Sequence, residues 1–466
     1  MNRRAFLKGM VAAGAMPMLP GCFSIVGSGS ATSYAANGRI RLASIGCGAQ
    51  AWFDLQKLAA TGLCDVVALC DTDLGAEHTL AALKTYPNVP RFHDFRMMFD
   101  KMAGKIDAVL VGIPDHAHFC AAMHAIKLGI HVYVEKPLAH SFLECQLLME
   151  AEAEYGVVCQ MGNQGHSGDN YAQYEQFYND GTIKNVTRVV SHMNMQRRWH
   201  KWGGKAASYP PAEKLPETLD WNAWLSAAPY HDFSKDLAYG EWRCWYYYGN
   251  GCMGDWGAHI LDTVHRFTLG GDLPTEVAIS NVTGWNPYVF PVQDTLTMFF
   301  PAKGRHGDVT LEWWEGLDNQ PKAPEGFRFD SNAGLFPANN ANDGLIDPKL
   351  KPGKEIYQAD GTIWQGLSHH APLKRVGGDT PAFQHVNGNH WANFLRAIRG
   401  EEEVRSPFRV SAPLSQIFCL GVVAQRLNRG FKFDPATGTC PDDEEVNRLL
   451  KGPAPRPGWE EYYAKG

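Results

Sequence analysis

Apolar runs and amphipathic stretches alternate along the first third of the chain. The apolar runs are short and rich in β-branched residues, which predicts strands buried on both faces. The stretches between them have the apolar spacing of helices. This alternation predicts an α/β fold with a Rossmann-type, doubly wound parallel sheet over residues 38–162. The predicted strands are 39–45, 65–70, 91–94, 106–113, 132–134 and 157–161, and the predicted helices are 52–60, 75–86, 95–103, 119–128 and 141–155.

The pattern changes in the second part of the chain. Alternating, β-rich runs predict strands there, so we expect an α+β domain over 163–430. Two amphipathic helices, 388–399 and 413–427, are expected to pack back on the first domain. The stretch 317–380 is rich in Gly, Pro, Asn and Asp, which is typical of a long loop, and 431–466 is expected to form a C-terminal arm. The predicted strands are 187–192, 276–282, 294–300 and 308–313.

The N-terminus carries an export pattern. Arg3-Arg4-Ala5-Phe6-Leu7-Lys8 precedes a short apolar run, which is typical of a twin-arginine signal, so residues 1–35 are set apart from the fold. Leu19-Pro20-Gly21-Cys22 is similar to a lipobox, in which Cys22 would carry a lipid anchor. Cleavage after Ala35 is the alternative. We expect a periplasmic protein, anchored to the membrane if Cys22 is lipidated.

Composition limits the kinds of ligand and partner that we expect. A net charge of −6 gives no sign of a nucleic-acid partner. The 11 cysteines are scattered and show no zinc-ligand spacing, so we expect no metal and no disulfide framework. A pairing of Cys244 with Cys252 stays open. Aromatic residues make up 12% of the chain and suit sugar rings as well as cores, which mildly favours a carbohydrate ligand.

A glycine-rich turn follows the first predicted strand. Gly46-Cys47-Gly48-Ala49-Gln50-Ala51 has the G-x-G-x-x-A spacing and precedes a helix. Gly46 permits the tight turn, Gly48 admits a pyrophosphate, and the helix N-terminus, with Ala49 and Gln50, faces the phosphates. The next strand ends at Asp71, whose carboxylate suits the ribose hydroxyls and repels a 2′-phosphate, so NAD is favoured over NADP. The alternative for Asp71 is a turn or capping role.

Further strand ends bring polar groups to the same edge of the sheet, where ligands bind in open α/β folds. Lys136 ends a buried run within Glu135-Lys136-Pro137, and a partly desolvated Lys there suits proton transfer. The alternative is a surface Lys paired with Glu135. The residues at this edge expected to contact the cofactor are Pro114, His118, Glu135, Lys136, Asn163 and Gln164.

A second cluster of candidate residues follows a glycine-rich lead-in. Asp255 and His259 are four residues apart, so a helix presents them on one face. A His near a carboxylate is a usable general base; a capping Asp and a structural helix His are the alternative. The preceding stretch, 193–248, is rich in aromatic residues and Arg, and either lines a sugar pocket or forms a packed lid. The expected substrate contacts are Lys136, Asn163, Arg243, Asp255 and His259.

With Gly46-x-Gly48, Pro114-x-x-x-His118 and Glu135-Lys136-Pro137 in this order, the chain resembles the Gfo/Idh/MocA family of NAD(P)-dependent oxidoreductases, and its exported bacterial branch in particular. The resemblance implies a second domain with an open, mostly antiparallel sheet, through which subunits form homo-oligomers. It also implies that Lys136 contacts the substrate and the nicotinamide ribose and relays protons. Asp255 and His259 match the family's catalytic pair, with His259 as the base.

Two functions follow from this resemblance. The first is oxidation or reduction of a hydroxyl of a sugar or glycoside, with a cofactor that stays bound and is recycled because free NAD is scarce outside the cytoplasm. The second is an NAD-dependent glycosidase that acts through a transient keto-sugar and elimination. Relatives with that activity on N-acetylgalactosamine generally lack the Glu-Lys-Pro form, which argues against that specificity. A sugar sensor without turnover is disfavoured by the intact Lys136, Asp255 and His259.

Overall fold

The computed structural model describes residues 38–193, 206, 208–316, 318–322, 352–367 and 371–464. The predicted export signal, Cys22 and the run Arg197-Arg198-Trp199-His200 lie outside these residues. The described part contains ten buried cysteines, and no disulfide joins Cys244 to Cys252, the pair that the sequence left open.

Six strands form the first sheet in the order β3-β2-β1-β4-β5-β6, and every neighbouring pair is parallel. The predicted Rossmann-type sheet is therefore confirmed. Apolar side chains of β1 alternate between two cores, with Ile40 and Leu42 in one and Ala43 and Ile45 in the other. The strands are β1 (Ile40–Ile45), β2 (Cys64–Cys70), β3 (Arg91–Phe92), β4 (Ala108–Val111), β5 (His131–Val134) and β6 (Cys159–Met161).

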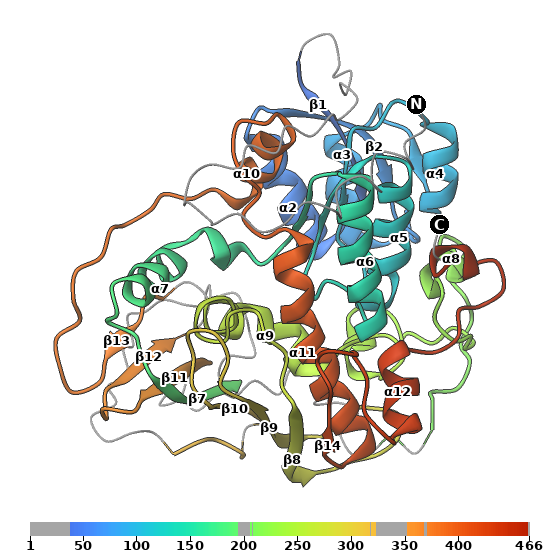
Figure 1. Ribbon diagram of the computed structural model, residues 1–466. Helices are drawn as coiled ribbons and strands as arrows, with labels where there is room; N and C mark the ends of the chain where they lie inside the picture. The colour runs from blue at the N-terminus through green and yellow to red at the C-terminus, as the bar shows by residue number, and fades with distance from the viewer. Residues whose placement is uncertain are drawn as a thin grey trace, which may run out of the picture. The chain divides into compact units, whose positions relative to one another are not determined.

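Helices cover both faces of this sheet (Figure 1). α2 and α10 share one core with β1, through Leu55 and Phe394. α5 packs on β4 and β5 in the other core and is backed by α6. α5 begins at Asp115, not at the expected residue 119, because Pro114 starts it and an acidic first turn suits the helix dipole. The helices are α2 (Ala49–Ala60), α3 (Leu80–Thr85), α4 (Phe95–Lys101), α5 (Asp115–Lys127), α6 (Phe142–Tyr155) and α10 (His390–Ile398).

Eight strands form the second sheet in the order β13-β12-β11-β7-β10-β9-β8-β14. β7 and β10 are parallel, and every other neighbouring pair is antiparallel. The expected mostly antiparallel sheet is confirmed. The strands are β7 (Val186–Met193), β8 (Glu276–Thr283), β9 (Gln293–Phe300), β10 (Val309–Glu315), β11 (Gly353–Gln358), β12 (Ile363–Leu367), β13 (Lys374–Arg375) and β14 (Phe431–Lys432).

Three of these strands, β11, β12 and β13, come from the stretch 317–380, which we expected to be a loop. β11 lies beside β7 and carries charged side chains that are buried. Lys354 donates to the carbonyl of Ile260 at 2.7 Å, and Glu355 lies 3.1 Å from Nε2 of His192. Buried charges of this kind carry no hydrophobic signal, which explains why the apolar pattern missed the strand.

α11 (Phe408–Leu427) connects the two sheets. It packs along α6 of the first domain and against α9 (Gly251–Thr263) and β8 of the second (Figure 1). It begins at Phe408, before the expected 413, and so contains Pro413. The helix is long and apolar enough to span a membrane, but most of it is buried inside the protein, as in a core helix.

The segment 431–466, expected as a C-terminal arm, packs against the rest of the chain over its described residues. Phe431 pairs with Val277 of β8, and α12 (Glu444–Lys451) packs on α6 and α11. Trp459 is only 2% exposed and lies edge-on to Phe95 of α4. The aromatic residues near the end of this arm give it a buried anchor.

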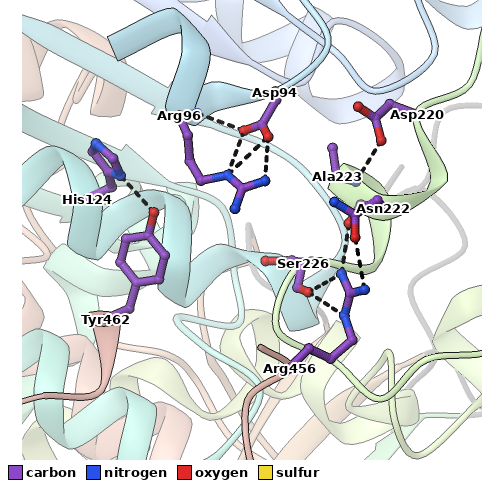
Figure 2. A network of polar contacts seen from close by, with 9 residues as sticks. All are labelled: Asp94, Arg96, His124, Asp220, Asn222, Ala223, Ser226, Arg456 and Tyr462. Carbon is purple, nitrogen blue, oxygen red and sulfur yellow. Dashed lines mark hydrogen bonds and ion pairs between the residues drawn. The ribbon is translucent and has the colours of Figure 1, made fainter. Parts of the chain in front are cut away.

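Figure 2 shows what this anchor holds in place. The hydroxyl of Tyr462 lies 2.8 Å from Nδ1 of His124 on α5. Arg456 donates to the side chain of Asn222 at 3.0 Å and to the carbonyl of Ser226 at 2.9 Å. Because α8 (Trp221–Leu225) includes Asn222 and ends beside Ser226, the C-terminal segment fixes α8 against the first domain.

Candidate active site

A cavity of about 720 Å³ lies at the carboxyl edge of the first sheet. One part of its wall is the glycine-rich turn with Gly46, Gly48 and Asp71, and another part is formed by Lys136, Asp255 and His259. The two groups predicted from separate parts of the sequence therefore face one cavity. The other predicted residues in its wall are Ala49, Gln50, Pro114, His118, Glu135, Gln164 and Arg243.

The glycine-rich turn has the geometry of a dinucleotide cradle. Gly46 has a φ of +99°, and a Cβ there would lie 2.2 Å from the carbonyl oxygen of Gly112, so only glycine fits. A Cβ on Gly48 would lie 2.2 Å from the ring of His78. α2 begins at Ala49 without a side-chain cap, which leaves its first amides available to an anion.

Asp71 lies at the end of β2, in the cavity wall. Its carboxylate accepts hydrogen bonds from the backbone amides of Cys47 at 2.8 Å and Asp73 at 3.1 Å. Burial raises its pKa, and the two amides oppose that shift. The carboxylate thus links the glycine-rich turn to the loop after β2, at the place where ribose hydroxyls were predicted to bind.

His118 supports the cavity wall from α5. Its Nδ1 lies 2.8 Å from the carbonyl oxygen of Pro137, and its Nε2 lies 2.8 Å from that of Ile113. Burial lowers the pKa of the imidazole to about 4, and the two carbonyl oxygens oppose that shift. Since both nitrogens face carbonyl groups of the protein, His118 holds the Glu135-Lys136-Pro137 turn in place, and it lines the cavity as well.

Lys136 reaches from the first domain to α9. Its Nζ donates to Oδ1 of Asp255 at 2.9 Å and to the backbone carbonyl of the same residue at 2.8 Å. The two side chains are 13% and 5% exposed. This excludes the alternative of a surface Lys paired with Glu135. Glu135 instead accepts a hydrogen bond from Nε2 of Gln164 at 2.8 Å.

Asp255 and His259 lie on one face of α9, and both line the cavity. Arg243 places its Nε 3.6 Å from Oδ1 of Asp255, and its guanidinium lies over the ring of Trp242. The carboxylate of Asp255 therefore has two cations beside it, Lys136 and Arg243. The ring of His259 lies edge-on to the ring of Trp256, which also lines the cavity.

Asp115 is a site residue that sequence reasoning missed. It is buried, lines the cavity and accepts the backbone amide of Asn250 at 3.0 Å. Burial raises its pKa to about 7, although the charges of Arg243 and Lys136 oppose the shift. Its position directly after Pro114, at the end of β4, was the available signal, because strand ends deliver the groups of this edge.

Asn163 departs from the prediction. It is 1% exposed, it is absent from the cavity wall, and its Nδ2 donates to Oδ2 of Asp262 at 3.1 Å. The same carboxylate lies 3.0 Å from Nδ1 of His166. Asn163 thus belongs to a buried polar cluster with Asp262 and His166, outside the cavity wall that the other predicted residues share.

The segment 218–243 closes part of the cavity. Thr218 donates to Oδ1 of Asp73 at 2.6 Å, and the hydroxyl of Tyr239 donates to Oδ2 of the same residue at 3.1 Å. The backbone amide of Asp220 donates to the carbonyl of Thr72 at 2.8 Å. These contacts tie the aromatic-rich segment to the loop after Asp71. The sequence left two roles open for this segment, a wall of a sugar pocket or a packed lid. Leu219, Tyr239 and Trp242 line the cavity as well.

The donor set fits NAD. The uncapped start of α2 suits a pyrophosphate, and the partly buried acid Asp71 follows the second strand, as a ribose partner does. NAD, when bound, would supply a hydride acceptor at the end of the cavity that holds Lys136 and His259. Among the described residues, no group of three or more His, Cys, Asp or Glu side chains is placed to hold a metal ion.

Comparisons with protein families give two matches. Residues 40–163 match the model of the GFO_IDH_MocA family, described as an oxidoreductase family with an NAD-binding Rossmann fold. Residues 178–286 match the C-terminal α/β domain of the same family. The first match spans the six strands of the first sheet, and the second match spans β7 and β8 of the second sheet.

Curated relatives match over less than a third of the chain. A protein of Akkermansia muciniphila named glycosyl hydrolase family 109 protein 2 is 26% identical over 151 residues, which is 31% of this chain and 32% of that protein. An inositol 2-dehydrogenase of Salmonella typhimurium is 31% identical over 133 residues, 28% of this chain and 38% of that protein. The matches therefore span about a third of the length of these relatives.

Solved structures share the fold over most of the chain. The WlbA dehydrogenase of Bordetella pertussis, crystallised with NADH and UDP-GlcNAcA, has a TM-score of 0.56 at 14% identity, covering 85% of this chain and 99% of that one. The WlbA dehydrogenase of Chromobacterium violaceum, crystallised with the same two ligands, has a TM-score of 0.60 at 12% identity, covering 86% and 98%.

Proposed function

Because this chain belongs to the Gfo/Idh/MocA family of NAD-binding oxidoreductases, we propose that it oxidises or reduces a hydroxyl of a sugar or glycoside with NAD. The observation that carries the proposal is the ion pair of Lys136 with Asp255, 2.9 Å apart, beside His259 in the cavity that contains the glycine-rich turn. An inositol 2-dehydrogenase among the relatives supports a polyhydroxylated substrate.

The side chains divide the work of this reaction. His259 takes the proton of the substrate hydroxyl as a general base. Lys136, fixed by Asp255, donates a hydrogen bond to the substrate oxygen and relays the proton. Arg243 and Asp115 complete a charged wall that binds further hydroxyls.

We propose in addition that the cofactor stays bound between turnovers. The segment 218–243 is tied to Thr72 and Asp73 by three hydrogen bonds and lines the cavity next to Asp71. Arg456 of the C-terminal segment also holds α8, which lies within the segment 218–243. A dinucleotide in this cavity would therefore leave only after these contacts open.

An NAD-dependent glycosidase is the second candidate, and the relatives named glycosyl hydrolase family 109 favour it. It shares the first oxidation step with the first candidate. Oxidation acidifies the neighbouring C–H bond, and elimination of the glycosidic bond follows. The product distinguishes the two candidates, since the glycosidase releases the aglycone and ends with its cofactor reoxidised.

The experiment purifies the folded protein, records the absorbance band of reduced nicotinamide and adds a panel of sugars and aryl glycosides. Persistent reduction, without release of the aryl group, supports the oxidoreductase. Release of the aryl group without net reduction supports the glycosidase. If neither occurs and no nicotinamide nucleotide binds, the proposal is refuted.

Export and assembly are separate proposals. We propose that Arg3 and Arg4 direct export to the periplasm and that Cys22 carries a lipid. Cell fractionation tests both, because Arg3→Lys/Arg4→Lys should retain the protein in the cytoplasm and Cys22→Ala should release it from the membrane fraction. We also propose a homo-oligomer formed through the second sheet; light scattering of the uncleaved protein should give at least twice the chain mass of 51.6 kDa, and a single chain mass would refute the oligomer.

A further inference from the structure

Two carboxyl groups meet behind the cavity wall. Asp54 on α2 and Glu135 at the end of β5 are 0% and 5% exposed, and their side chains are hydrogen-bonded to each other. A hydrogen bond between two carboxyl groups requires a proton on one of them. Glu135 lines the cavity, whereas Asp54 lies behind it and is absent from the wall.

The neighbours of Asp54 show which group holds the proton. Oδ1 of Asp54 accepts from Nε1 of Trp391 at 2.8 Å and from Nε2 of Gln50 at 3.2 Å, and both donors are neutral. Glu135 accepts from Gln164 and has the charge of Lys136 nearby. Burial and the charge of Glu135 raise the pKa of Asp54 against these two donors, whereas the charge of Lys136 opposes the effect of burial on the pKa of Glu135, so we assign the proton to Asp54.

Glu135 has little freedom to turn away from the cavity. A Cβ on Gly162 would lie 2.2 Å from its Oε1, which shows how closely the carboxylate packs on that backbone. Gln164 holds the same oxygen at 2.8 Å, and the backbone amide of Lys136 lies 3.3 Å from Oε2. The Nζ of Lys136 is directed at Asp255, so the carboxylate of Glu135 is not neutralised by a direct ion pair with it.

We propose that Asp54 and Glu135 share one proton and present a single negative charge to the nicotinamide end of the cavity, where it stabilises the oxidised cofactor. This inference rests on the proposed function, because it requires NAD in the cavity. The oxidised nicotinamide ring carries a positive charge and the reduced ring carries none. A fixed carboxylate beside it therefore favours NAD over NADH and keeps the reduced form short-lived. Asp54 is a positioning residue that acts through Glu135.

The test is the two-electron potential of the cofactor bound to the full-length protein, measured by reductive titration against a reference dye. Asp54→Asn mimics a protonated Asp and should change the ratio of NAD to NADH affinity by less than about twofold. Asp54→Asn/Glu135→Gln removes the charge and should lower that ratio about 10- to 100-fold. A tenfold change raises the potential by about 30 mV.

A second readout needs no cofactor. The infrared difference between wild-type and Asp54→Asn protein should contain the carbonyl band of one protonated carboxyl group. The inference is overturned if the double variant keeps the wild-type potential, if Asp54→Asn alone shifts it as far as the double variant, or if the carbonyl band is missing. A protein that binds no nicotinamide nucleotide at all overturns the proposed function, and this inference with it.

Discussion

Replacing Lys136 by Met separates the chemistry of the site from its stability. Lys136→Met keeps the aliphatic stem and removes the ammonium group 2.9 Å from Asp255. At an effective dielectric constant of about 20, two charges at this distance attract by about 6 kcal/mol, most of which offsets the burial of both groups. Removing one partner of a buried pair costs about 3–5 kcal/mol. Because Arg243 stays 3.6 Å from the carboxylate, we expect a loss at the lower end of that range.

Turnover should respond differently from stability. Lys136→Met should lower turnover about 10²- to 10⁴-fold, the usual effect of a group that handles protons. The double variant Lys136→Met/Asp255→Asn places two neutral groups together but leaves Arg243 without the carboxylate, so it should regain part of the unfolding free energy and none of the turnover. Urea unfolding followed by tryptophan fluorescence measures the first quantity, and the product assay measures the second.

The control for these variants is Lys84→Met, on an exposed position of α3, which should change the unfolding free energy by less than about 0.5 kcal/mol. If Lys136→Met has the same unfolding free energy as the wild-type protein, the buried ion pair of Lys136 with Asp255 is refuted. Recovered turnover in the double variant would refute the catalytic role of Lys136.

Three further predictions concern the other walls of the cavity. Asp71→Ser removes the carboxylate that repels a 2′-phosphate, so calorimetry should show the affinity for NADP rising about tenfold relative to NAD; an unchanged ratio would exclude Asp71 as the selector. Burial raises the pKa of Asp115 from 3.8 to about 7, so the folded state holds its proton more tightly and this group's contribution to stability falls as pH rises from about 4 to 7. Asp115→Asn should therefore gain stability relative to wild type across that window, by at most about 1.4 kcal/mol per pH unit, in urea unfolding at several pH values; a pH-independent difference would contradict the shift. Tyr239→Phe loses the hydrogen bond to Asp73 and should release bound cofactor a few times faster after dilution into a competing nucleotide, whereas an unchanged rate would show that the segment 218–243 does not retain it.

The first sheet could be predicted because its information is local. Each apolar run, such as 106–113, is bounded by its own turn residues, and Gly46-x-Gly48 lies directly between a strand and a helix. The edge to which parallel strands deliver their last residues then follows from topology. This is why Lys136, from the first domain, could be placed near a cofactor before any contact was known.

What could not be predicted depends on partners distant in the sequence. The strand β11 carries the buried Lys354 and Glu355, whose partners lie on α9 and β7. Asn163 follows β6 at the carboxyl edge of the first sheet, but its side chain donates a hydrogen bond to Asp262 of α9. The carboxyl pair of Asp54 and Glu135 joins residues 81 positions apart, and no local pattern marks either as protonated. Spacing within one segment cannot reveal such pairs.

The central claim is that a hydride moves between a sugar carbon and NAD held in this cavity. The most direct test incubates the purified protein with monosaccharides and methyl glycosides carrying deuterium on their carbinol carbons, then measures the mass of the released cofactor. One deuterium should appear on the nicotinamide ring with the wild-type protein, and none should appear with Lys136→Met. Product formed by the wild-type protein without label on the cofactor would contradict the claim.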